Sequence, residues 1–181
     1  MPRNKTVIFI GGLAGSGKSS TAKMLARRFG LRHVSAGDIF RAIAKERGEN
    51  LIALGRYAEK HPEFDKVLDD RLLAEARKGR VILDGRAGAY LSKKRRIKAL
   101  KVFLSVDPLV SAKRVAKRDG TTIKAALAQS RLREREVARR LKRLYGLDTS
   151  DTSYYDAVIQ TDGYTVKEVV DLITELVKYG N

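Results

Sequence analysis

A glycine-rich segment near the start of the chain has the spacing of a phosphate-binding loop. It runs Gly-Leu-Ala-Gly-Ser-Gly-Lys-Ser over residues 12–19 and matches G-x-x-x-x-G-K-[ST] at every fixed position. Glycines let the backbone turn sharply, so that consecutive N–H groups form a concave anion site. The Lys18 ammonium would reach the β- and γ-phosphates of a nucleoside triphosphate, and the Ser19 hydroxyl would bind Mg²⁺ directly. The predicted phosphate contacts are Gly12, Leu13, Ala14, Gly15, Ser16, Gly17, Lys18, Ser19 and Ser20.

Two arginines that follow other apolar runs predict a second anion site. Arg41 ends the segment Ser35-Ala-Gly-Asp-Ile-Phe-Arg41, and Arg86 ends Asp84-Gly-Arg86. Two guanidinium groups over one crevice can hold a phosphate dianion through paired hydrogen bonds. The Asp84 carboxylate, beside the loop, would bind Mg²⁺ through water. The predicted acceptor-phosphate site comprises Ser35, Gly37, Asp38, Arg41, Asp84, Gly85 and Arg86.

Two later stretches of the chain are strongly basic. Arg114 and Arg118 are four residues apart and would share a helix face, and residues 131–143 carry seven basic residues against two glutamates. Phosphoryl transfer needs cations that draw two mutually repelling anions into line, and a flap that excludes water. Residues 119–122, between the two stretches, are the best candidate for this flap. A solvated basic helix surface is the alternative explanation for the charge.

Other charged residues are not expected to act in catalysis. A phosphate acceptor has a second pKa near 6 and is already ionised at pH 7, so no general base is required. His33 and His61 are therefore expected to be structural or exposed. The run 93–96, Lys-Lys-Arg-Arg, is expected to be a solubilising surface feature, and Glu136 and Arg140 have the spacing of an ordinary helix-surface pair.

Composition narrows the class of protein. The 181 residues can form one domain with its own core. There is no cysteine, so disulfides and thiolate zinc sites are excluded, which fits a cytoplasmic location. No apolar run is long enough to span a bilayer, and the first strand follows Met1 too closely for a signal peptide. The net charge of +17 predicts attraction to polyanions: nucleotides, RNA or an acidic membrane surface.

Five short apolar runs predict the strands of a parallel sheet. They cover residues 6–10, 32–34, 81–83, 101–106 and 157–160. Segments of helical periodicity separate them, a pattern typical of an α/β, doubly wound sheet with helices on both faces. The first helix is expected to follow the glycine loop and to end before Gly30, and the others are expected at residues 39–48, 51–58, 62–78, 109–118, 122–144 and from 165 onward. Ligands of such sheets lie beyond the carboxyl ends of the strands, so the two predicted anion sites should share one crevice.

The last predicted helix has a recognisable start. Thr165-Val-Lys-Glu168 is a capping box, in which the two side chains bind each other's backbone N–H groups. The apolar face of this helix is predicted to consist of Val169, Leu172, Ile173 and Leu176.

With these motifs, the chain resembles nucleoside monophosphate kinases, and most closely the short cytidylate kinases of archaea. The resemblance covers essentially the whole chain. The phosphate loop is shared by many enzymes, whereas the Ser-Ala-Gly-Asp-x-x-Arg segment narrows the field to monophosphate kinases. The segments that carry the resemblance are 12–19, 35–41, 58–65, 84–86, 114–118, 145–148 and 155–159, of which 58–65 and 145–159 point toward cytidylate.

The resemblance implies transfer of a phosphoryl group from Mg-ATP to CMP or dCMP. It implies a three-layer P-loop kinase fold over residues 1–181, with a helical NMP-binding insertion at about 35–80 and a short lid at about 119–145. Arg114 and Arg118 would frame the lid, and one or more arginines of the long helix would close on the phosphates. The implied catalytic residues are Lys18, Arg114, Arg118, Arg131, Arg133 and Arg140.

The sequence departs from the family pattern in three places. Glu136-Val137 and Arg140-Leu141 stand where the family carries Ser-Glu and Arg-Tyr. Ala87 follows Asp-Gly-Arg, where bacterial cytidylate kinases have an acidic residue that helps to read cytosine. Recognition of the base is therefore expected from other residues, with Asp65 or Asp69 and Arg71 as the candidates.

Two alternative functions remain open from the sequence. The nearer one is an adenylate kinase or a monophosphate kinase of broad range. The other is an ATP-dependent nucleic-acid-binding protein, which is less favoured because basic residues concentrate near the proposed crevice and no aromatic motif for stacking bases is present. The expected partners are therefore ATP and CMP or dCMP, without nucleic acid or membrane, and the expected state is a monomer.

Overall fold

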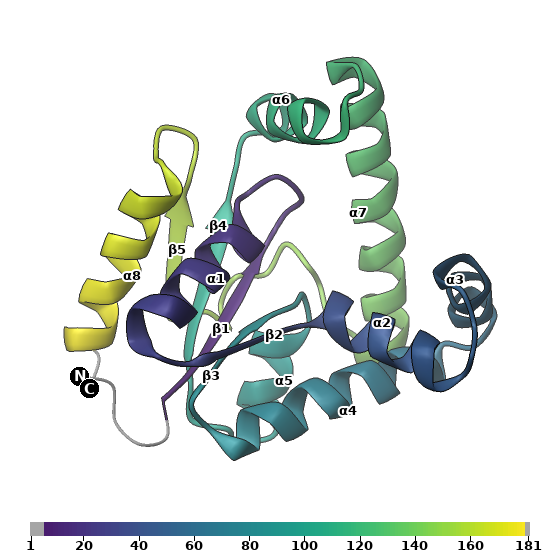
Figure 1. Ribbon diagram of the computed structural model, residues 1–181, viewed down its shortest axis with the longest axis horizontal. Coiled ribbons are helices and arrows are strands. Elements are labelled where there is room, and N and C mark those ends of the chain that lie inside the picture. The colour runs from purple at the N-terminus through teal and green to yellow at the C-terminus, as the bar shows by residue number, and fades with distance from the viewer. Residues whose placement is uncertain (1–5, 180–181) are drawn as a thin grey trace.

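A five-stranded parallel sheet forms the centre of the computed structural model, which describes residues 6–179 (Figure 1). The strand order is β2-β3-β1-β4-β5, and all four neighbouring pairs are parallel. The strands are β1 (Val7–Gly12), β2 (Arg32–Ser35), β3 (Val81–Asp84), β4 (Leu100–Ser105) and β5 (Ala157–Gln160). The predicted fold class is confirmed, and each strand lies within two residues of its expected bounds.

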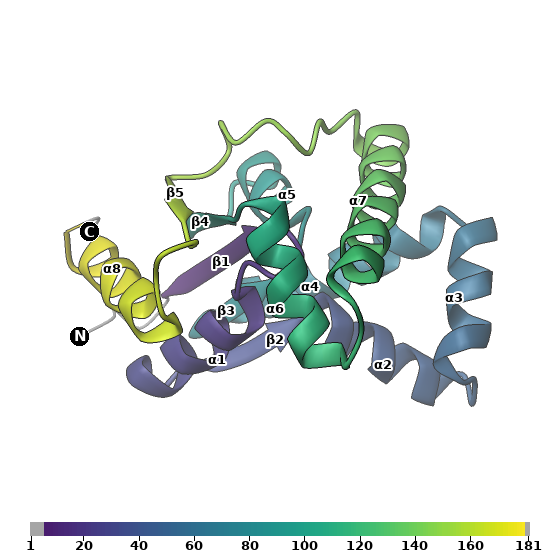
Figure 2. The same ribbon diagram turned by 90° about the horizontal axis from the view of Figure 1, so that it is seen from above.

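Helices cover both faces of the sheet, as predicted. They are α1 (Lys18–Phe29), α2 (Ala36–Glu46), α3 (Leu51–Lys60), α4 (Glu63–Lys78), α5 (Gly88–Lys94), α6 (Pro108–Asp119), α7 (Ile123–Tyr145) and α8 (Val166–Tyr179). Helices α1 and α8 lie on one face, and α4 and α5 lie on the other, with the long α7 standing beside the sheet (Figures 1 and 2). Helix α5 is absent from the sequence-based assignment. None of the described helices is long and apolar enough to cross a membrane.

Two apolar layers follow from the alternation of side chains along β1. Ile8 and Ile10 point toward α1 and α8, where they pack with Leu25 and Ile173. Phe9 points to the opposite face and packs in a second cluster with residues of α2 to α5 and α7. The central strand is thus buried on both faces, as its uninterrupted apolar sequence predicts.

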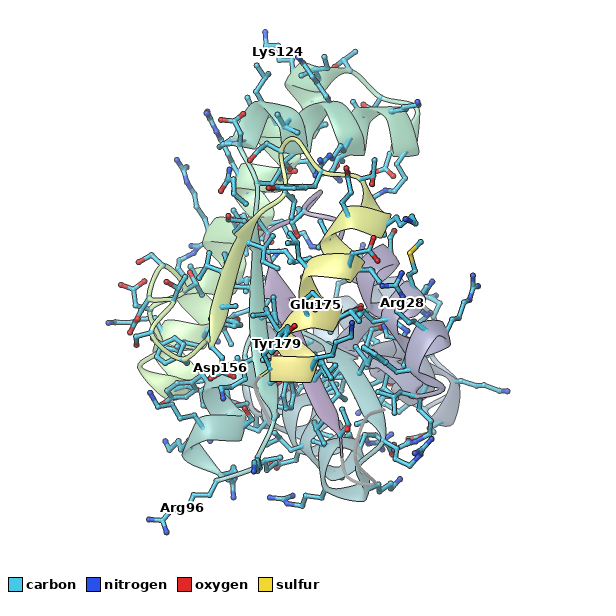
Figure 3. All side chains as sticks on the ribbon, turned by 90° about the vertical axis from the view of Figure 1, so that its left-hand side faces the viewer. Arg28, Arg96, Lys124, Asp156, Glu175 and Tyr179 are labelled. Carbon is cyan, nitrogen blue, oxygen red and sulfur yellow. The ribbon has the colours of Figure 1, made fainter. Side chains whose placement is uncertain are left out.

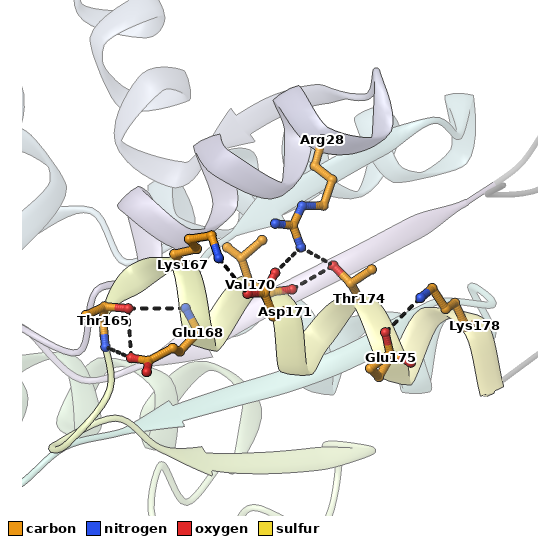
Figure 4. A network of polar contacts seen from close by, with 9 residues as sticks. All are labelled: Arg28, Thr165, Lys167, Glu168, Val170, Asp171, Thr174, Glu175 and Lys178. Atoms are coloured by element: carbon orange, nitrogen blue, oxygen red, sulfur yellow. Dashed lines mark hydrogen bonds and ion pairs between the residues drawn. The ribbon is translucent and has the colours of Figure 1, made fainter.

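The contact between α1 and α8 fixes the first of these layers (Figure 4). Arg28 on α1 donates to Asp171 and to Thr174 Oγ1, the latter at 3.0 Å. The capping box at Thr165 and Glu168 is confirmed, because each side chain accepts from the other's backbone N–H.

One prediction for the apolar face of α8 is wrong. Leu172 is 42% exposed, whereas Val170 is fully buried in its place. The helix presents the Val169, Val170 and Ile173 stripe to α1, which turns Leu172 outward.

Positive charge extends beyond the expected crevice. Lys124 at the start of α7 and Arg96 after α5 lie at opposite ends of the molecule in Figure 3. The expectation that basic residues concentrate near the crevice is therefore only partly met.

Candidate active site

The phosphate loop joins the end of β1 to the start of α1. Gly12 has φ +144°, and a Cβ there would lie 2.3 Å from the Leu104 carbonyl oxygen. Gly15 has φ +70°, and its Cβ would lie 2.7 Å from Ser111 Oγ. These two positions require glycine for both conformation and space. Inside the turn, the Leu13 carbonyl accepts from Ser16 Oγ at 2.9 Å and from Lys18 Nζ at 3.2 Å.

The first turn of α1 is open to an anion. Its N-cap is Gly17 in the left-handed region, without a side-chain cap, and no acidic residue lies in the first turn. Within the described residues no side chain caps this helix start, so its backbone N–H groups and the positive end of the helix dipole can face a bound anion. The hydroxyl-bearing residues Ser19 and Ser20 are exposed on this turn. The loop and the helix start have the geometry that binds phosphate in proteins.

Lys18 is a buried cation among other charges. Burial, together with the neighbouring charge of Arg86, lowers its pKa to about 8. The carboxylates of Asp84 and Glu134 act in the opposite direction, and the charge of Arg133 on α7 adds to the lowering. A phosphate bound at the loop would supply the negative charge that restores the protonated ammonium.

Asp84 is held at the carboxyl end of β3 by the neighbouring strand. It is 6% exposed, and its Oδ2 lies 3.2 Å from Nε2 of His33 on β2. His33 is thus a structural residue, as expected, but one that orients a site carboxylate. The Asp84 carboxylate and the Ser19 hydroxyl are hard oxygen donors that fit Mg²⁺, with Ser19 exposed and free to turn toward it.

The residues predicted to bind the acceptor phosphate begin at the start of α2. Ser35 caps the helix by accepting from the Asp38 N–H at 3.0 Å, and Asp38 accepts from the Ser35 backbone in return. Arg41, one turn into α2, pairs with Asp38, and its side chain is 60% exposed. Ser35 pairs in register with Asp84 across β2 and β3. The predicted acceptor residues therefore gather at one edge of the sheet.

Arg86 and α7 close the other side of this edge. Both terminal nitrogens of Arg86 bind the carboxylate of Glu134, with Nη2 at 2.7 Å from Oε1. The same Oε1 accepts from the backbone N–H of Ala14 in the phosphate loop at 3.2 Å. One carboxylate of α7 therefore joins the predicted triphosphate site to the predicted acceptor site.

Arg114 lies against the phosphate loop, as one of the predicted catalytic residues. Its guanidinium donates to the Gly15 carbonyl at 3.3 Å and to the Thr161 carbonyl at 2.7 Å. Ser111, one turn earlier on α6, donates to the Ala14 carbonyl at 2.8 Å. Helix α6 thus supports the loop from behind and links it to the end of β5.

The other predicted catalytic arginines are placed differently. Arg118 pairs with its neighbour Asp119 and is 66% exposed. In the described part of the chain, Arg131 and Arg133 form no ion pair with a carboxylate. Arg140 binds Asp65 on α4 instead of the expected surface partner Glu136. Of this set, Lys18 and Arg114 hydrogen-bond to carbonyl oxygens of the phosphate loop. The charge of Arg133 contributes a small part of the lowering of the Lys18 pKa.

The candidate base-reading residues are engaged within the protein. Asp65 is bound by Arg140, and Asp69 accepts from Tyr145 Oη at 2.8 Å. Arg71 pairs with Glu46 on α2. Their role toward a base stays a prediction.

Three residues at the site were not predicted: His33 as the partner of Asp84, Ser111 behind the loop, and Glu134 between the two anion sites. Glu134 is one of the two glutamates among the basic residues 131–143, and the sequence assigns it no role. Their contacts link positions 51, 97 and 120 residues apart, and no local spacing signals such contacts.

The chain is similar in sequence to the proteins of one family. The family model described as "Cytidylate kinase-like family" matches residues 7–163. The cytidylate kinase of Pyrococcus horikoshii is 39% identical over 173 residues, covering 96% of this chain and 88% of that protein. That of Methanocaldococcus jannaschii is 38% identical, covering 94% of this chain and 97% of that protein.

Solved structures support the fold alone. A shikimate kinase from Bacteroides thetaiotaomicron superposes with a TM-score of 0.63 at 17% identity, over 96% of this chain and 98% of that chain. A shikimate kinase from Acinetobacter baumannii gives a TM-score of 0.64 at 15% identity, over 98% of this chain and 96% of that chain.

Proposed function

Because the chain belongs to the cytidylate kinase-like family, we propose that it transfers the γ-phosphoryl group of ATP to CMP or dCMP, giving ADP and CDP or dCDP. The observation that carries this proposal is the meeting of two anion sites at one carboxylate. Glu134 accepts from the Ala14 N–H of the phosphate loop and from Arg86 at the end of β3. Donors for two phosphate groups thus lie within the span of a single side chain, as transfer between two nucleotides requires.

The phosphate loop would hold the donor nucleotide. Its backbone N–H groups and the start of α1 would bind the β- and γ-phosphates, and Lys18 would place its ammonium against them. Arg114 would keep the loop in shape through Gly15. Mg²⁺, when bound by Ser19 and through water by Asp84, would neutralise charge on the phosphate oxygens.

The acceptor would lie at the carboxyl ends of β2 and β3. Arg41 and Arg86 would hold the CMP phosphate, whose oxygen attacks the γ-phosphorus in line with the departing β–γ bridging oxygen. The acceptor oxygen carries no proton to remove at pH 7, so the side chains supply charge and alignment instead of a base. An arginine of α7 would follow the phosphoryl group, and we expect it to be Arg133, whose charge contributes a small part of the lowering of the Lys18 pKa.

An acceptor panel tests the proposal. Purified protein is assayed for ADP formation with ATP and Mg²⁺ and, in separate reactions, CMP, dCMP, UMP, AMP or GMP. We expect CMP and dCMP to give the highest kcat/KM, because a site that hydrogen-bonds one base rejects another. Equal or higher kcat/KM with AMP would favour an adenylate or broad-range kinase and overturn the choice of substrate. A monomeric state and a cytoplasmic location stay expectations from the sequence.

A further inference from the structure

Glu134 occupies a position between the two proposed phosphates. Its Oε1 accepts from the Ala14 N–H at 3.2 Å and from Arg86 Nη2 at 2.7 Å, and its Oε2 binds Arg86 Nη1. A carboxylate in the fork of a guanidinium uses the same donors, in the same plane, that two oxygens of a phosphate would use. The side chain therefore takes the place of an anion at the acceptor site.

The Arg86 fork cannot hold two anions at once. Its Nη1 and Nη2 are both engaged by the Glu134 carboxylate. A phosphate that binds Arg86 through the same two donors must therefore displace that carboxylate.

The Glu134 side chain can move away from Arg86 into solvent. Glu134 is 29% exposed and projects from α7, most of whose surface faces solvent. A CMP phosphate carries close to two negative charges at pH 7 and offers Arg86 a stronger partner than a single carboxylate does. A neutral water molecule cannot replace the Glu134 carboxylate in this way, because Arg86 would then be left without a counter-charge.

We propose that the Glu134 carboxylate occupies the binding site of the acceptor phosphate. It thereby keeps water away from the position in line with the γ-phosphorus until CMP displaces it. This inference rests on the proposed function and deepens it, because it assigns the preference for a phosphate acceptor over water to one side chain. In this role Glu134 acts by occupying Arg86, and it also accepts from the Ala14 N–H of the phosphate loop.

The reaction that Glu134 suppresses is hydrolysis of bound ATP. A water oxygen forms a bond to the γ-phosphorus, the bond from that phosphorus to the β–γ bridging oxygen breaks, and the products are ADP, inorganic phosphate and a proton. In transfer, the CMP phosphate oxygen forms the new bond instead. Both reactions need the same in-line position, so a group that fills this position when CMP is absent protects ATP.

The test uses Glu134→Ala, which empties the position, and Glu134→Gln, which keeps the size and removes the charge. ADP and inorganic phosphate are measured with Mg-ATP in the absence of CMP, and CMP binding without ATP is measured by calorimetry.

We expect acceptor-independent hydrolysis to rise about tenfold or more in Glu134→Ala. We expect the Kd for CMP to fall severalfold in both variants, because the competing carboxylate is gone. Glu136→Gln, an exposed position on the same helix, is the matched control and should change neither quantity.

Each outcome has one meaning. Unchanged hydrolysis and unchanged CMP affinity in the Glu134 variants would overturn the inference. A weaker CMP affinity would also overturn it, since it would make Glu134 a contact of the acceptor. Failure of the wild-type protein to phosphorylate CMP would instead overturn the proposed function, and calorimetry with the nucleotide that the acceptor panel identifies would then test Glu134.

Discussion

Arg140 on α7 binds both carboxylate oxygens of Asp65 on α4, although the two residues are 75 positions apart. The Arg140 Nε lies 2.9 Å from Asp65 Oδ2, and the Asp65 side chain is 8% exposed. Resemblance assigned Arg140 to the phosphates, and Asp65 was a candidate for reading the base. In the structure Arg140 and Asp65 bind each other, and this pair fixes α7 against α4.

Replacement of Arg140 by alanine should destabilise the fold. The change leaves the buried Asp65 carboxylate without its partner, and the expected loss in the free energy of unfolding is about 2 kcal/mol. The loss stays below the roughly 3–5 kcal/mol of a fully buried pair, because Arg140 is 40% exposed. Urea denaturation followed by circular dichroism measures it. Arg139→Ala, at an exposed neighbouring arginine, is the control, and an equal loss in both variants would contradict the role of the pair.

The stability of the protein should depend on pH through Asp69. Burial, with the nearby charges of Asp65 and Asp70 adding to it, raises the pKa of Asp69 to about 6, although the hydrogen bond from Tyr145 opposes the rise. The native state therefore holds this proton more tightly than the unfolded chain does. The stabilisation it contributes is complete below about pH 4 and is lost as the pH rises to about 6. Asp69 lines a cavity of about 280 Å³. The basic residues that line this cavity with it are Lys66, Lys94 and Arg95.

Asp69→Asn isolates this effect, because asparagine resembles the protonated acid at every pH. The free energy of unfolding of the variant relative to wild type should increase by about 1–3 kcal/mol between pH 4 and pH 7. Urea denaturation at four pH values in that range measures the difference. Glu175→Gln, at an exposed carboxylate on α8 and away from Asp69, should show a nearly constant difference. A constant difference for Asp69→Asn as well would show that its pKa is not raised.

Lys18 should take up a proton when ATP binds. Its pKa of about 8 in the nucleotide-free protein leaves part of the population neutral at pH 8, and bound phosphates favour the charged form. Calorimetric titration of ATP at pH 8, in two buffers of different ionisation enthalpy, should show uptake of a fraction of a proton. ATP affinity should fall as the pH rises above about 8. Lys18→Ala should abolish the uptake and lower kcat by about 100-fold or more, whereas Lys23→Ala, at an exposed lysine of the same helix, should change neither. Equal uptake in Lys18→Ala would place the proton elsewhere.

The parts of the fold that could be predicted are those with a local signal. The apolar run of β1, the loop glycines and the stop at Gly30 lie within 30 residues and define strand, loop and helix together. Helix α5 has no such signal, because it spans seven residues that begin with a glycine and end with two lysines. Its place depends on Gly88, where a Cβ would lie 2.6 Å from the Phe9 ring, a contact between distant parts of the chain.

In the candidate site, too, the residues that could be predicted are those with a local sequence signal. The loop and the acceptor segment were predicted because each motif is continuous in sequence and follows a strand. The partners of the arginines could not be predicted, because they depend on the rotation of α7 about its axis. A helical pattern places Glu136 beside Arg140, but the packing of α7 turns Arg140 toward Asp65 and Glu134 toward Arg86.

Arg41 offers a sharp test of two separate phosphate sites. It lies at the acceptor edge, is 60% exposed, and is held by Asp38 alone among the described carboxylates, so it is available to a bound phosphate. Arg41→Ala should raise the KM for CMP by about 10- to 100-fold, the range for loss of a hydrogen bond between two charged groups. The KM for ATP should change less than about twofold, because the phosphate loop is untouched. Steady-state kinetics with each nucleotide varied in turn measures both values. Lys45→Ala, one turn further along α2 at an exposed position, should leave both unchanged. A matching rise in the KM for ATP would mean that the two nucleotides do not bind to separate groups of residues.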